Sequence, residues 1–239
     1  MKRAERHHLK ANELQKLAVQ ARDVYEERHR EVSGVLIGLL VVAVAGVGYF
    51  LWREHVQSRA HGLLAEALAV QEARVAVAGT PATPGTYPTE RARLEGAVVK
   101  LKTAADAYPS TDAGIFARYQ EAANHLALGN TTAAIAAYQE VTRRAGDNIY
   151  GQMARFGVAE AQARGGQFDQ AINSFKELAQ RKDGPIPVDG ILMELGRAYR
   201  DAGKRADAQQ TFNRLVEEYP DSPFTQEAKR ELDTLNKAA

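Results

Sequence analysis

The sequence predicts an all-α protein: a single N-terminal transmembrane helix, then an α-solenoid of helix pairs that ends in a C-terminal capping helix. Two patterns in the 239 residues favour this fold class: an uncharged apolar segment at 32–52, and a set of residues that recurs every 37 positions. The composition agrees, because 45% of the residues are apolar and 26% are charged, which is typical of a chain that folds.

Residues 1–31 are expected to form a cytoplasmic amphipathic arm. Leu14, Leu17, Ala21 and Val24 form an apolar stripe at helical spacing. The stripe covers about two heptads, which is less than a coiled coil requires. Acidic and basic residues alternate along the arm, so we interpret it as a solvated or membrane-proximal helix.

The segment 32–52 is predicted to cross a membrane. Its 21 residues carry no charge, and a helix of that length rises roughly 31 Å, which matches the hydrocarbon core of a bilayer. Tyr49 and Trp52 lie at its end, where aromatic rings favour the membrane interface.

Lysine and arginine counts predict the orientation of this span. Residues 1–31 contain eight of them and the 20 residues after the span contain two, which favours a cytoplasmic N-terminus and an exported remainder, 53–239. A cleavable signal peptide is the alternative, since residues 43–45 read Ala-Val-Ala. The long polar leader favours an uncleaved signal anchor instead.

Gly34, Gly38 and Gly46 are candidates for a packing face on the span. Gly34 and Gly38 form a G-x-x-x-G pattern, and Gly46 extends the same face. Such faces allow close approach of another membrane helix, so a homo-oligomer is one possible arrangement. The alternative is that these glycines reflect only the high glycine content of membrane helices.

After the span, residues 54–78 are expected to form a helix with apolar Leu64, Leu68, Ala69, Val75 and Ala76. The segment 79–88, GTPATPGTYP, contains three prolines and two glycines and is therefore predicted to be an exposed loop.

A 37-residue period then repeats through the chain, and it indicates stacked helix pairs. The recurring columns are Gly129, Gly166 and Gly203; Ala134, Ala171 and Ala208; Tyr138, Phe175 and Phe212; Val141, Leu178 and Leu215; and the small residues Ala122, Ala159 and Gly196. Ala97, Leu101 and Ala104 extend it one unit upstream. Residues 224–237 are expected to form the capping helix, since a repeat array must cover its last apolar face.

The last unit resembles the tetratricopeptide repeat family. It carries the family's spacing of Leu192, Leu195, Gly196, Tyr199, Ala208, Phe212 and Pro220. The two preceding units depart from the pattern, because Arg155 and Gln162, and before them Arg118 and His125, occupy the columns of Leu192 and Tyr199. We therefore expect their first helices to pack in a shifted or looser way.

No catalytic or cofactor motif appears, so the sequence predicts neither an enzyme nor a cofactor. The chain has no cysteine, and its six histidines are scattered, which leaves no pattern for a metal site. The exported part carries 23 basic and 24 acidic residues, so no charge excess indicates nucleic acid as a partner.

The family resemblance implies a partner-binding groove on the first helices. The matching positions here include Phe116, Tyr119, Met153, Phe156, Glu160, Arg164, Met193, Arg197 and Arg200. An apolar strip rimmed by arginines would suit an acidic peptide or amphipathic helix. The alternative is that Tyr119, Phe156 and Met193 replace missing core residues and are buried.

The layout as a whole resembles the bacterial YfgM family, ancillary subunits of the SecYEG translocon. This resemblance implies a scaffold in the inner membrane whose periplasmic domain binds translocon subunits, chaperones or exported clients. The repeats also resemble those of BamD and CpoB, which implies, as an alternative, a scaffold for outer-membrane assembly or cell-division coordination. A self-associating structural membrane protein is the third interpretation.

Overall fold

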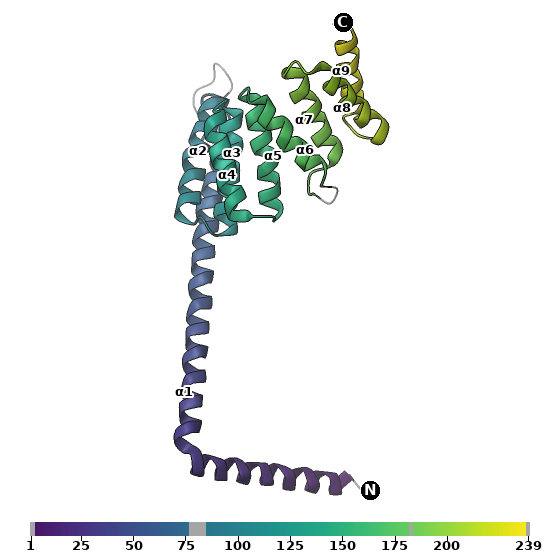
Figure 1. The fold of residues 1–239 in the computed structure, drawn as a ribbon. Coiled ribbons are helices and arrows are strands. Elements are labelled where there is room, and N and C mark those ends of the chain that lie inside the picture. The colour runs from purple at the N-terminus through teal and green to yellow at the C-terminus, as the bar shows by residue number, and fades with distance from the viewer. Residues whose placement is uncertain (1–2, 77–84, 182–183, 238–239) are drawn as a thin grey trace. The chain divides into compact units, whose positions relative to one another are not determined.

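The computed structural model describes residues 3–76, 85–181 and 184–237, with side chains from residue 33 onward. These residues form nine α-helices, labelled in Figure 1. The helices are α1 (Arg3–Gln71), α2 (Glu90–Ala107), α3 (Asp112–Ala127), α4 (Thr131–Ala145), α5 (Ile149–Arg164), α6 (Phe168–Ala179), α7 (Val188–Asp201), α8 (Arg205–Glu218) and α9 (Thr225–Lys237).

Contacts divide the chain into two units, Met1–His55 and Val56–Ala239. The first unit consists of the N-terminal part of α1, and its side chains from Val35 to Trp52 are exposed. Within Ser33–Gln71 the mean hydropathy reaches 2.5, so this helix is long and apolar enough to cross a membrane. The predicted stripe of the arm, from Leu14 to Val24, lies outside the described side chains.

The second unit is a solenoid of helix pairs, which confirms the predicted fold class. The end of α1 pairs with α2, α3 with α4, α5 with α6 and α7 with α8, and α9 follows (Figure 1). Each helix from α2 to α8 packs on the next one in the chain. Such a nearest-neighbour arrangement is the signature of a repeat array.

The 37-residue columns form the core of these pairs. Tyr138 is 3% exposed, and its equivalents Phe175 and Phe212 are fully buried. The small-residue columns are also buried, which allows paired helices to approach closely. Their members are Ala134, Ala171 and Ala208, with Ala122, Ala159 and Gly196.

Three first helices end in the same way because a glycine follows each of them. Gly129, Gly166 and Gly203 have φ angles of 80°, 76° and 72°, in the left-handed region that favours glycine. The next residue in each repeat donates its backbone N–H to a carbonyl five residues earlier, as in Asn130 to His125 at 2.8 Å. This is the Schellman geometry, and it turns the chain into the second helix.

The helix predicted at 54–78 ends earlier, at Gln71. Its buried face consists of Ala60, Leu64 and Ala67, which pack against α2, whereas the predicted Ala69 is exposed. Val75 lies beyond the end of the helix and forms an isolated parallel bridge with Tyr87, which belongs to the segment predicted as loop. Residues 77–84 of that loop lie outside the described structure.

The capping helix α9 covers the end of the array. Ala228 and Leu235 join the core cluster of α7 and α8, and Phe224 packs against the same cluster. In addition, Arg197 and Arg200 of α7 form ion pairs with carboxylates of α9. The cap is therefore held by both apolar contact and ion pairs.

Replacing Gly196 with alanine should test the close approach of α7 and α8. A Cβ at Gly196 would overlap the buried ring of Phe212. We expect Gly196→Ala to lower the free energy of unfolding by about 1–2 kcal/mol, after allowance for the gain in helix propensity. The measurement is urea unfolding of the full chain in detergent, followed by circular dichroism.

Gly62→Ala is the matched control, since Gly62 is an exposed helical glycine with no atom near the position of an added Cβ. This variant should be slightly more stable than the wild type. Equal stabilisation in both variants would contradict the packing described for Gly196.

Candidate functional site

All nine residues predicted to form a partner groove lie on the first helices α3, α5 and α7. Tyr119 on α3 and Phe156 on α5 are half-buried, and each ring lies edge-on to a buried core ring. The ring centroids are 5.4 Å apart for Tyr119 and Tyr138, and 5.5 Å apart for Phe156 and Phe175. These two aromatic residues therefore contact the core on one side and remain partly exposed at the surface on the other.

Met193 is not on this surface. Its side chain is fully buried in the cluster formed by α6, α7, α8 and α9, so it is a core residue. Phe116 and Met153 are half-buried, and the ring of Phe116 lies 5.6 Å from that of Tyr150. The predicted apolar strip is therefore interrupted at α7.

The arginines of the predicted rim are already paired within the chain. Arg164 donates to Glu160 at 2.7 Å, and Arg197 pairs with both Glu194 and Glu227. Arg200 donates to Asp201 and to Glu231, at 2.8 and 2.5 Å. Each of these guanidinium groups therefore has a carboxylate partner within the chain, and binding of an acidic peptide to this face stays a prediction.

A second kind of surface lies between consecutive second helices, where the first helix between them forms the floor. In the structure this position occurs three times, and equivalent residues are again 37 apart. It is occupied by an ion cluster over α3, by a basic pocket over α5 and by a C-terminal pocket over α7. The three differ in chemistry although they occupy the same place in their repeats.

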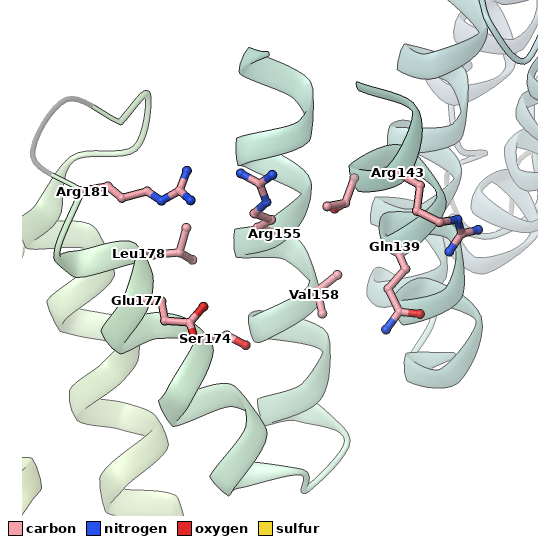
Figure 2. Close-up of a pocket in the computed structure, with 9 residues that line it drawn as sticks. Gln139, Arg143, Arg155, Val158, Ser174, Glu177, Leu178 and Arg181 are labelled. Carbon is pink, nitrogen blue, oxygen red and sulfur yellow. The ribbon is translucent and has the colours of Figure 1, made fainter. Parts of the chain in front are cut away.

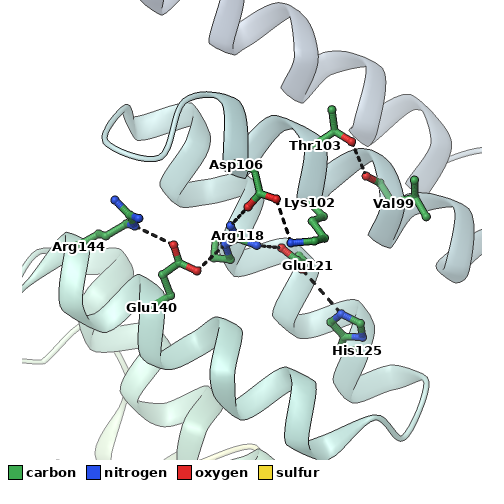
Figure 3. Close-up of polar contacts among 9 residues, drawn as sticks. All are labelled: Val99, Lys102, Thr103, Asp106, Arg118, Glu121, His125, Glu140 and Arg144. Atoms are coloured by element: carbon green, nitrogen blue, oxygen red, sulfur yellow. Dashed lines mark hydrogen bonds and ion pairs between the residues drawn. The ribbon is translucent and has the colours of Figure 1, made fainter.

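Over α3, Arg118 lies at the centre of the ion cluster (Figure 3). Its guanidinium contacts Asp106 of α2, Glu121 of α3 at 2.5 Å and Glu140 of α4 at 3.1 Å. Lys102 and Arg144 neutralise the remaining carboxylate oxygens of Asp106 and Glu140, both at 2.9 Å. We use the name ion cluster for these six residues.

Burial and charge act in opposite directions in this cluster. Burial lowers the pKa of Arg118, but the surrounding carboxylates more than compensate, so the pKa of Arg118 is raised. Burial raises the pKa of Glu121 despite its contact with Arg118. Hydrogen bonds from Lys102 and Arg118 lower the pKa of Asp106. The cluster therefore closes the space over α3 with charges that neutralise one another.

Over α5, the same position is open and forms the basic pocket of about 330 Å³ (Figure 2). Val158 and Leu178 provide its apolar surface, and Arg155 and Arg181 lie side by side at one end. The pocket is lined by Gln139, Thr142, Arg143, Arg155, Val158, Ser174, Glu177, Leu178 and Arg181. Its lining has three arginines and one glutamate.

Over α7, the C-terminal pocket of about 580 Å³ has a different floor. Leu192 and Leu195 occupy the columns of Arg155 and Val158, and both are buried. Lys176 and Arg214 are its basic residues, and Arg214 donates to Glu218 at 2.9 Å. This repeat therefore keeps apolar packing where the two earlier ones have arginine.

The sequence shows Arg118 and Arg155 in unusual columns, but the predicted groove does not include these surfaces. The signal was present: the 37-residue period also relates the outward residues of the second helices, such as Asp106 and Arg143. The family resemblance instead places the expected groove on the first-helix face. The predicted looser packing corresponds to an ion cluster at Arg118 and to an open pocket at Arg155.

The glycines of the predicted membrane packing face, Gly34, Gly38 and Gly46, are exposed on α1. No atom lies within 4 Å of the position that a Cβ would take at any of them. Self-association through this face stays a prediction.

His125 next to the ion cluster should make stability depend on pH. Burial lowers the pKa of His125, and Lys102 acts in the same direction, while Glu121 lies 3.8 Å away. As the pH falls, the unfolded chain therefore takes up a proton at this residue before the folded chain does. We therefore expect the free energy of unfolding to be lower at about pH 5.5, below the ordinary histidine pKa of 6.5, than at about pH 7.5, above it.

His125→Gln should reduce this loss, since Gln162 occupies the same column in the next repeat. The measurement is the free energy of unfolding in urea at both pH values. An unchanged pH dependence in the variant would contradict the assignment to His125.

Comparisons with known proteins bear on the repeats. A tetratricopeptide repeat model matches residues 119–185, and a second model of this repeat matches residues 191–222. A comparison with curated protein sequences finds no match.

Among solved structures, the chain is similar to nearly identical TPR-like repeats assigned to a kinesin light chain of Podosopora anserina. The identity is 15%, with 76% of this chain and 87% of that chain covered and a TM-score of 0.56. A single-substitution variant of that protein gives 16% identity, the same coverage and a TM-score of 0.57. This likeness concerns the fold. Residues 119–185 and 191–222 therefore match tetratricopeptide repeats, and they lie within an α-solenoid.

Proposed function

We propose that this protein is a membrane-anchored tetratricopeptide scaffold that holds protein or peptide partners beside a membrane. The observation that carries the proposal is the continuity of α1. This one helix contains the exposed apolar segment and also supplies Leu64 and Ala67 to the core of the first helix pair. An anchor and a repeat array that share a helix are suited to present partners at the membrane surface.

Tetratricopeptide repeats typically act as protein-interaction scaffolds and not as enzymes. An open solenoid offers long, accessible surfaces to a partner. Among the described residues, no group of three or more His, Cys, Asp or Glu side chains is placed to hold a metal ion. The basic pocket and the first-helix face are the surfaces that we propose for partner binding.

The finer role that we propose follows from the resemblance in layout to the YfgM family. The array would lie in the periplasm of a bacterium and link the Sec translocon to chaperones or exported clients. The excess of lysine and arginine before the apolar segment, eight against two after it, favours this orientation. The partners would then meet the array close to the inner membrane.

In-cell crosslinking tests this function. A photoreactive residue is placed at Ser174 in the basic pocket or at Tyr119 on the first-helix face, in the full chain. We expect crosslinked products that contain translocon subunits, periplasmic chaperones or exported chains. The same residue at exposed Val99 on α2 is the matched control, and it should give much less product.

Recovery of outer-membrane assembly or cell-division proteins would replace the Sec-linked role by the envelope-scaffold alternative. Recovery of this chain alone would contradict the scaffold function and favour a self-associating membrane protein. Orientation is checked in the same cells, because the natural chain has no cysteine. Ser110→Cys should react with a membrane-impermeant maleimide from the periplasmic side, and Asn12→Cys should not.

A further inference from the structure

We infer that the basic pocket over α5 binds a peptide segment of a partner protein in which a bulky apolar side chain is flanked by carboxylates. The inference rests on the proposed scaffold function and deepens it by naming the site and the chemistry of the partner. It rests on the difference between the residues of the basic pocket and those of the ion cluster, which occupies the same position one repeat earlier.

The ion cluster shows what an arginine at this position requires. Arg118 is 7% exposed and contacts three carboxylates, which come from α2, α3 and α4. A buried guanidinium is stable only when carboxylates or other acceptors surround it. Asp106 and Glu121 are two of these three groups.

In the basic pocket, the equivalent carboxylates are missing. Arg155 takes the place of Arg118, but Arg143 stands in the column of Asp106 and Val158 stands in the column of Glu121. Glu177, in the column of Glu140, is the one acidic residue of the lining. At these two columns the ion cluster has acidic residues, whereas the basic pocket has one basic and one apolar residue. A ligand with carboxylates would neutralise the arginines of the basic pocket, as the chain's own carboxylates neutralise Arg118 in the ion cluster.

The existing partner of Arg155 lies at the border of the pocket. Asp147, between α4 and α5, places Oδ1 2.7 Å from Nη1 of Arg155 and 3.7 Å from Nη1 of Arg181. Its side chain is 78% exposed, and hydrogen bonding from Arg155 lowers its pKa. Because Asp147 itself is largely exposed, a ligand carboxylate can replace or share its contact with Arg155 at small cost. No ion pair in the described part of the chain involves Arg143.

The apolar part of the pocket indicates that the ligand also carries a bulky apolar side chain. Val158 is smaller than Leu195, its equivalent in α7, and leaves space next to Leu178. The resulting volume of about 330 Å³ is at the lower end of ligand pockets in proteins. It is suited to one or two large side chains, which are the usual anchors of a protein interface. An apolar anchor between carboxylates therefore fits both halves of the pocket.

The other surfaces match this ligand less well. On the first-helix face every arginine already forms an ion pair within the chain, whereas Arg143 of the basic pocket forms none among the described residues. In the C-terminal pocket, Asp207 is acidic and Arg214 is paired with Glu218. The basic pocket combines three arginines with an open apolar floor.

Saturation-transfer NMR tests the inference with the full chain in lipid nanodiscs. The probe is the peptide acetyl-Glu-Leu-Phe-Glu-amide, and its uncharged analogue acetyl-Gln-Leu-Phe-Gln-amide is the matched ligand control. We expect saturation of the leucine and phenylalanine protons of the acidic peptide and about tenfold weaker binding of the analogue. Empty nanodiscs correct for association with lipid.

Two sets of variants place the binding site. Arg143→Gln with Arg181→Gln removes exposed cations and should weaken binding of the acidic peptide about tenfold or more. Arg91→Gln with Arg230→Gln makes the same change in charge at exposed residues of α2 and α9 and should have no effect. Arg143→Asp with Val158→Glu rebuilds the acidic columns of the ion cluster in the pocket and should abolish binding while the chain stays helical.

Equal binding of the acidic and uncharged peptides would overturn the inference, as would binding that the arginine variants leave unchanged. Binding lost only with Tyr119→Ala would move the site to the first-helix face. If the arginine variants instead convert a dimer of the chain to a monomer, the occupant is a second copy and the inference is wrong. Partner crosslinking from Tyr119 with no peptide binding in the pocket would leave the scaffold function standing and refute this site alone.

Discussion

The packing of each first helix against two consecutive second helices is the constraint on which the array depends. Every repeat must fill the same space with residues at the same columns, because the helix pairs are held in register by buried Tyr138, Phe175 and Phe212. Small residues opposite these rings fix the distance between paired helices. The side chains that line the outer side of this space can then vary, and the chain uses three solutions. A neutral ion cluster fills it over α3, an open pocket with three arginines occupies it over α5, and over α7 an open pocket has buried leucines as its floor.

The difference between the ion cluster and the basic pocket relates stability to function. Arg118 has its carboxylates within the chain and belongs to the folded core, whereas Arg155 has lost two of the equivalent carboxylates and faces a pocket. A side chain of the same type is therefore structural in one repeat and available for recognition in the next. The columns around these arginines hold similar residues in both repeats, so the two sites differ at only a few positions. It leaves the solenoid itself intact.

Much of the fold could be predicted from the sequence, because its determinants recur at a fixed spacing. Gly129, Gly166 and Gly203 mark the ends of three first helices, and the alanine and aromatic columns mark the second helices that follow. The candidate site was less predictable. Whether Met193 points to the core, and whether Arg197 is free or paired with Glu227, depends on the rotation of α7 and the placement of α9. After the early end of α1 at Gln71, Val75 forms a bridge with Tyr87, and a pairing of residues this far apart has no local pattern in the sequence.

The free energies of unfolding of Arg118→Leu and Arg155→Leu, measured side by side in the full chain, test the account most directly. Both variants place the leucine of the last repeat, Leu192, at the equivalent column. We predict that Arg118→Leu costs about 3–5 kcal/mol, since it leaves buried Glu121 without its cation. Arg155→Leu should stay within about 1 kcal/mol of the wild type, because it leaves only the exposed carboxylate of Asp147 without its cation and adds apolar contact. Equal losses in the two variants would contradict the distinction between a structural and a binding arginine.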